Sequence, residues 1–140
     1  MTELFLMPDI EELVVTYLSS LEPLSELNVK VSDEVQQNAR FPQVLIGRIG
    51  GVGMSPNWLD PARIQIDVRA QTKRVAHSVA VLVRALLEEL PGTDNDFGVV
   101  TDVTDDLGLQ WLPDPSVKPP RPRYVFGVIV RVHPLVDQGS

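Results

Sequence analysis

The two histidines are the first residues to consider for chemistry, because imidazole is a common general base near neutral pH. His77 shares a helical face with Arg84 and Glu88, and His133 stands at the end of the last apolar run. No serine in a Gly-x-Ser-x-Gly setting accompanies either of them, and two isolated histidines lack the spacing of a zinc site. We interpret His77 as a solvated side chain and His133 as an unconvincing base.

Two further patterns partly match ligand-binding loops. The glycines in 47–53 are not followed by Gly-Lys-Ser/Thr, and Pro56 blocks the helix whose N-terminus would bind a phosphate. Asp94, Asp96 and Asp105 match part of a calcium loop, but glycine and valine occupy two of its defining positions. The second pattern is more typical of a solvated acidic turn. The sequence therefore predicts no catalytic residue, no metal and no cofactor, and the protein is not expected to be an enzyme.

The composition indicates one domain in a reducing compartment. The chain has 140 residues, a net charge of -7 and no cysteine, so disulfides and thiolate metal sites are excluded. The acidic charge argues against wrapping nucleic acid, which needs clustered lysine and arginine. The longest apolar run ends at Arg84 and is too short for a membrane span, and residues 1–7 lack the features of a signal peptide. We expect a soluble intracellular protein without membrane contact.

Apolar residues at helical spacing predict two helices. A capping box at Asp9 begins the first helix and Pro23 ends it. The second helix runs from Thr72 to Leu90, before a Pro-Gly pair, and has a broad apolar face. We expect the second helix to be the main cover of a sheet.

Period-two patterns predict about five strands, over residues 28–32, 43–49, 62–70, 99–112 and 124–133. The fourth is either one bent strand or a hairpin that turns at 105–108. Successive strands without a helix between them should be mostly antiparallel. We predict a single α+β domain over 1–140, with a mostly antiparallel sheet, two helices on one face, and tails at 1–7 and 135–140 that are flexible or ordered only on assembly.

Two strands have informative faces. In the third, apolar residues alternate with Arg63, Gln65, Asp67 and Arg69, which is typical of a sheet with one wet face. These polar residues could also line an interface or a channel. The last strand, 124–133, has apolar residues on both faces. It is therefore either central in the sheet or covered by a partner subunit.

Two loop segments could contact a partner. Trp58 lies in a glycine- and proline-rich loop at 50–61, where it either folds back on the core or anchors into a neighbour. The segment Pro119-Pro120-Arg121-Pro122-Arg123 suits a groove that binds polyproline II helices. A rigid entry to the last strand, with its arginines in salt bridges, is the simpler interpretation.

Four short strings stand in a familiar order. A Pro-Asp-Ile-Glu-Glu helix start at 8–12 precedes the strand Ala-Arg-Ile-Gln-Ile-Asp-Val at 62–68 and its long helix, and Trp-Leu-Pro-Asp-Pro at 111–115 precedes Pro-Arg-Tyr at 122–124. Together they resemble the tail terminator proteins of long-tailed phages, most closely those of phages that infect actinobacteria. The likeness covers roughly residues 7–133 and contains no catalytic motif.

This resemblance implies a small α+β protomer that forms a hexameric ring at the head-proximal end of the tail tube. There it would stop tube growth and dock the head-completion proteins, as part of the virion and, during assembly, in the host cytoplasm. Genomic DNA would pass through without specific binding. Expected contacts with neighbouring subunits, tube or neck are Met54, Trp58, Arg63, Arg69, Arg121 and Arg123, and expected lumen residues are Asp94, Asp96, Asp105 and Asp106.

Three alternatives remain at this point. Another neck component, a head-completion or stopper protein, shares the size, acidity and ring symmetry. A small hydrolase or ligand-binding domain would need convergent polar groups between the second helix and the sheet, where the assigned faces are almost wholly apolar. A monomeric adaptor would present residues 119–123 as a peptide ligand. The arginines on the third strand also leave open that its charges are paired with one another.

Overall fold

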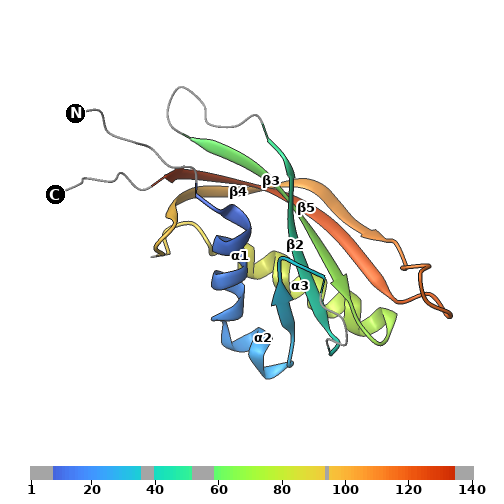
Figure 1. The fold of residues 1–140 in the computed structure, drawn as a ribbon. Coiled ribbons are helices and arrows are strands. Elements are labelled where there is room, and N and C mark those ends of the chain that lie inside the picture. The colour runs from blue at the N-terminus through green and yellow to red at the C-terminus, as the bar shows by residue number, and fades with distance from the viewer. Residues whose placement is uncertain (1–7, 36–39, 52–58, 94, 135–140) are drawn as a thin grey trace, which may run out of the picture.

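A computed structural model describes residues 8–35, 40–51, 59–93 and 95–134 (Figure 1). These residues form three helices and one five-stranded sheet whose strand order is β1-β2-β3-β5-β4. The strands are β1 (Lys30–Ser32), β2 (Gln43–Gly50), β3 (Asp60–Arg69), β4 (Gly98–Trp111) and β5 (Arg123–Pro134). The helices are α1 (Ile10–Ser19), α2 (Glu22–Glu26) and α3 (Lys73–Leu87). The predicted α+β class is thereby confirmed. The predicted tails at 1–7 and 135–140 lie outside the described residues.

The sheet is mixed but mostly antiparallel. The pairs β2/β3, β3/β5 and β4/β5 are antiparallel, whereas β1 and β2 run parallel, with Lys30 opposite Gln43 and Ser32 opposite Leu45. The mostly antiparallel pairing that we predicted is confirmed, and β1 with β2 is its one exception among the described strands. Two parallel strands start at the same end of the sheet, so the chain must return to that end between β1 and β2. A tight hairpin turn cannot make this connection.

The helices differ from the prediction at their ends. The carboxylate of Asp9 caps α1 by accepting from the backbone N–H of Glu12 at 3.1 Å, as expected. Pro23 does not end this helix but lies in the first turn of α2, where its missing N–H costs nothing. Thr72 caps α3, which ends at Leu87, earlier than expected. The prediction of two helices is thus short by one within the described residues.

One hydrophobic core joins all the elements. The helix-covered side of β3 is fully buried, and so are Val128, Val130 and Val132 of β5. They pack against α1 and α3, which both cover this face of the sheet (Figure 1). The alternating apolar pattern of β3 predicted its buried face, which is formed by Ala62, Ile64, Ile66 and Val68.

The two open questions about strands are answered. β5 lies between β3 and β4, so it is an interior strand of the sheet. Residues 98–111 form one continuous strand rather than a hairpin. The register of β4 against β5 shifts at three places, between Val100 and Asp102, between Asp105 and Leu107, and between Leu107 and Gln110. Such bulges bend a strand and increase its local twist.

Candidate assembly surface

The outer edge of β4 is the largest unpaired backbone edge in the described part of the chain. β4 ends the strand order and pairs only with β5, and it is 14 residues long. The opposite edge of the sheet is β1, which has only 3 residues. An exposed edge offers a row of backbone donors and acceptors that another chain can pair with. The sheet therefore has one long free edge and one short one.

The side chains of β4 protect this edge only in part. The strand contains neither proline nor lysine. Four of its large apolar side chains are exposed to between 38% and 54%, namely Val99, Leu107, Leu109 and Trp111. Its protective devices among the described residues are three bulges and three aspartates, Asp102, Asp105 and Asp106, each of which pairs with an arginine of the protomer. Apolar exposure of this kind on a long edge is typical of a surface that a partner covers.

Trp111, the last residue of β4, packs against β5 and α3. Its ring centroid lies 5.1 Å from that of Tyr124 on β5, and the ammonium of Lys73 lies 4.7 Å above the indole. The helix-facing side of the strand end is thus packed against the start of α3. The indole nevertheless remains 38% exposed, so it forms the rim of the apolar surface rather than part of the core.

Arg84 of α3 binds the middle of β4. Its Nε donates to Oδ1 of Asp105 at 2.6 Å, and one terminal nitrogen lies 2.7 Å from Glu88 one helical turn on. The hydrogen bond from Arg84 lowers the pKa of the Asp105 carboxyl and raises the pKa of the guanidinium. Arg84 therefore fixes α3 against the edge strand.

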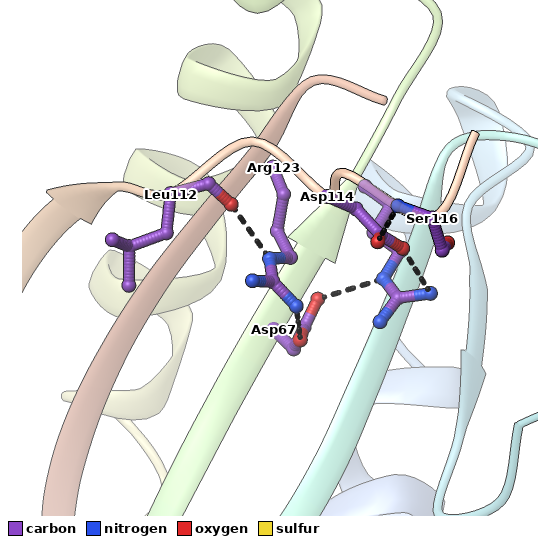
Figure 2. A network of polar contacts seen from close by, with 6 residues as sticks. Asp67, Leu112, Asp114, Ser116 and Arg123 are labelled. Carbon is purple, nitrogen blue, oxygen red and sulfur yellow. Dashed lines mark hydrogen bonds and ion pairs between the residues drawn. The ribbon is translucent and has the colours of Figure 1, made fainter. Parts of the chain in front are cut away.

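The wet face of β3 contains a closed network of charges instead of free ones (Figure 2). Arg69 donates through Nε to Asp67 at 3.1 Å and also pairs with Asp114 at 3.3 Å. Arg123 of β5 donates to the other oxygen of Asp67 at 3.4 Å and to the backbone carbonyl of Leu112 at 2.7 Å. Asp67 is only 6% exposed. Two arginines and two aspartates thus neutralise one another at the end of the sheet.

This network anchors the proline-rich connection between β4 and β5. The carboxylate of Asp114 accepts from the backbone N–H of Ser116 at 2.9 Å, and the backbones of Asp114 and Arg121 exchange two hydrogen bonds. Hydrogen bonds from Ser116, followed by the charges of Arg69 and Arg123, lower the pKa of Asp114. The rigid-entry interpretation is confirmed for Arg123, which makes a salt bridge, whereas the guanidinium of Arg121 stacks 4.1 Å from the Phe41 ring centre.

The structure separates the predicted contact residues. Arg69, Arg121 and Arg123 gather near the β4–β5 connection, while Arg63 lies further along β3 and pairs with Asp106 at 2.9 Å. Met54 and Trp58 lie outside the described residues. The arginines that we expected to bind a neighbour are thus already engaged within the protomer, and their role in subunit contacts stays a prediction.

The predicted lumen residues are also not gathered in one place. Asp105 binds Arg84 on the helix-covered face, and Asp106 binds Arg63 on the wet face. Asp96 is exposed in the turn before β4, and Asp94 lies outside the described residues. Asp96 and Asp105 are about 30 Å apart along an extended chain. Within one protomer, the described members of this set, Asp96, Asp105 and Asp106, therefore form no continuous acidic patch.

Sequence reasoning missed the most buried ion pair. Asp60 is fully buried and binds Arg48 of β2 through two hydrogen bonds of 2.7 Å each. The hydrogen bond to Asp60 raises the pKa of Arg48. The carboxylate of Glu11 on α1 accepts from the backbone N–H of Arg48 at 2.7 Å. The signal was present, because extending the alternation of β3 back from Ala62 by two residues places Asp60 on the core face.

The histidines and the comparisons give no catalytic function. His77 is exposed on α3, and its ring meets the edge of Tyr124 with a centroid distance of 5.3 Å. No group of three His, Cys, Asp or Glu among the described residues is placed to hold a metal. In the same residues, no helix has the length and apolar character needed to cross a membrane. The sequence matches no protein-family model, and no curated protein matches it significantly.

Proposed function

We propose that this protein is a structural subunit that assembles with copies of itself into a ring, in the role of a phage tail terminator. The observation that carries the proposal is the free edge of β4, which is long, apolar and unprotected by lysine or proline. A stable monomer normally covers or charges such an edge, and the three aspartates of β4 are each already paired with an arginine of the same protomer. Many proteins form rings, and we propose a phage tail protein because of the sequence resemblance to tail terminators.

A ring requires the β4 edge of one copy to meet a different surface of the next copy, because two β4 edges that pair with each other would give a two-fold dimer. The two sheet edges differ, because β4 has 14 residues while β1 has 3 and runs parallel to its neighbour. A contact between unlike surfaces is heterologous, and a heterologous contact closes into a ring when its rotation divides a full turn. A hexamer is the stoichiometry that the resemblance implies.

The charge of the chain suits a structure through which DNA passes. Each protomer carries a net charge of -7, and the arginines of the wet face are neutralised by aspartates. Six copies would carry about six times this charge around a channel, which repels phosphates and disfavours non-specific binding of DNA. Tail tube protein and head-completion proteins are the partners proposed on either side of the ring.

Two measurements test the proposal. Light scattering over a concentration series should show a mass of about six protomers, either alone or after the addition of tail tubes, and negative-stain images should show rings at one tube end. Rings that bind the portal side instead would support a head-completion or stopper protein. A monomer under every condition, tail tubes included, would overturn the proposed ring.

A further inference from the structure

A groove of about 180 Å³ lies between α3 and the middle of β4. Its walls are apolar on both sides, and Phe126 of β5 is among the lining residues. Val81 on one wall is 49% exposed, and Leu107 and Leu109 on the other are each 38% exposed. The groove therefore combines a small apolar space with side chains that remain partly in contact with water. Such a space suits one aliphatic side chain of a partner.

One polar group in the groove is unsatisfied. Arg84 lines it and uses Nε and one terminal nitrogen for Asp105 and Glu88. The other terminal nitrogen, Nη1, is buried and has no hydrogen-bond partner among the described residues. A buried donor without an acceptor is costly, and a partner that brings a carbonyl oxygen removes that cost once the guanidinium shifts toward the groove. The groove thus favours a partner with an aliphatic side chain and a free carbonyl.

The rim of the groove selects for positive charge. Arg84 faces two carboxylates, those of Asp105 and Glu88, whose side chains are 72% and 61% exposed. One positive and two negative groups leave an excess negative charge at the rim. A partner segment with a lysine next to its aliphatic residue would complement it.

The chain itself contains a segment with this chemistry. The connection between β4 and β5 projects beyond the ends of the strands (Figure 1). Residues 116–120 at its tip are all exposed, and Val117 is 42% exposed. Lys118 follows Val117 and makes no ion pair with any described residue, and Pro119 and Pro120 follow in turn. The prolines present carbonyls without N–H groups, so burying them leaves no donor unsatisfied.

We propose that the groove between α3 and β4 of one copy receives the Val117–Pro120 tip of a second copy. In this contact Val117 packs between Val81 and Leu109, Lys118 faces the carboxylates of the rim, and a carbonyl of the tip accepts from Arg84 Nη1. The groove and the tip are different surfaces of the protomer, so the contact is heterologous. This inference rests on the proposed self-assembly and names the surfaces that carry it.

Cysteine cross-linking tests this contact directly, because the chain has no cysteine of its own. The variants Val81→Cys and Val117→Cys are mixed under the conditions in which rings form and then oxidised. A disulfide needs Cα atoms within about 7 Å of each other. We expect a cross-linked dimer of the two variants at a rate at least about tenfold above that of the control pair. The control is Val75→Cys with Val117→Cys, because Val75 is an exposed valine on the same helix but does not line the groove.

A charge reversal provides an independent measurement. Lys118→Glu should weaken ring assembly by at least about tenfold, because the new carboxylate faces the acidic rim. Arg74→Glu makes the same change of charge at an exposed position on α3 and should leave assembly within about twofold. Equal effects of the two substitutions would overturn the role of Lys118.

The outcomes separate this inference from the proposed ring. If rings form but Val81→Cys with Val117→Cys cross-links no faster than the control, the tip-in-groove contact is wrong and the ring proposal survives. A dominant Val81→Cys homodimer would mean that α3 packs against α3, which also overturns the contact. If no ring forms even with tail tubes and no cross-link appears, both proposals fail.

Discussion

The wet face of β3 and the outer edge of β4 belong to the same sheet but differ in what they leave unsatisfied. On β3, the charged side chains of Arg63, Asp67 and Arg69 all have partners of opposite sign within the protomer. On β4, backbone groups and apolar side chains face solvent instead. Charge on a face therefore does not by itself indicate a binding surface. The region without internal partners is the better candidate.

The largest expected loss of folding stability concerns the buried ion pair of Arg48 with Asp60. Like the charges on the wet face of β3, these two charges are paired within the protomer. Arg48→Met leaves the carboxylate of Asp60 buried without its cation, and breaking such a pair costs about 3–5 kcal/mol of folding stability. Urea unfolding followed by circular dichroism measures the loss. The matched control is Arg131→Met, whose partner Asp102 is 51% exposed and whose pair should contribute at most about 1 kcal/mol.

The β3 network should also be structural. Asp67→Ala removes the acceptor shared by Arg69 and Arg123, and hydrogen bonds to charged groups contribute about 1.5–3 kcal/mol each. Because the bond to Arg123 is long at 3.4 Å and contributes little, we expect a loss of about 2–3 kcal/mol in urea unfolding. Assembly measured on the folded variant should change by no more than about threefold, because the tip of the β4–β5 connection is still held by the contacts of Asp114 with Arg69, Ser116 and Arg121. If the Asp67→Ala variant had normal stability but no longer assembled, the β3 face would be the binding surface, and our assignment of that role to β4 would be wrong.

The β4 edge should behave in the opposite way. Leu109→Lys places a charge on the exposed edge, which should leave the free energy of unfolding within about 0.5 kcal/mol but weaken assembly at least about tenfold. Val75→Lys is the control, because Val75 and Leu109 are both 38% exposed. Light scattering gives the assembly constant for each. If Leu109→Lys and Val75→Lys assembled equally well, the β4 edge would not be part of the subunit interface.

The smallest effect concerns pH. The pKa of Asp114 is lowered in the folded state by Ser116, Arg69 and Arg123, so its ionised form stabilises the fold. That contribution is fully present above the unfolded pKa of about 3.9 and is lost as the pH falls through the lower folded value. Asp114→Asn should therefore make stability less dependent on pH below about 4 than it is in the unaltered protein. Unfolding temperatures between about pH 2 and 6 measure this slope, and an unchanged slope would contradict the role assigned to Asp114.

The sequence predicted the fold well where one pattern decides the structure. The alternation of β3 located its buried face, and the capping residues Asp9 and Thr72 located the starts of α1 and α3. It failed at Pro23, because a proline is equally compatible with the end of one helix and the first turn of the next. The parallel pairing of β1 with β2 depends on a long-range path that local patterns do not contain.

The site was less predictable than the fold, because residue type does not reveal who pairs with whom. Arg69 and Arg123 were expected to contact a neighbour, yet both pair with Asp67 of the same protomer. Arg123 is 56 residues from Asp67 in the sequence, and the pairing of β3 with β5 brings the two together. Leu109 was assigned to a strand, but its exposure follows from β4 being the edge of the sheet. Strand order is a property of the whole chain, so a reading of local residues could not identify the edge.

The position of β5 has a consequence for the synthesis of this protein. β5 pairs with both β3 and β4 and follows both in the sequence, so neither strand has its inner neighbour until residues 123–134 have left the ribosome. A nascent chain that ends before residue 123 has β3 and β4 without the strand that joins them. The part of the sheet made by β3, β5 and β4 must then form after translation of this segment, through contacts distant in sequence. Truncated products are thereby kept from forming the folded subunit.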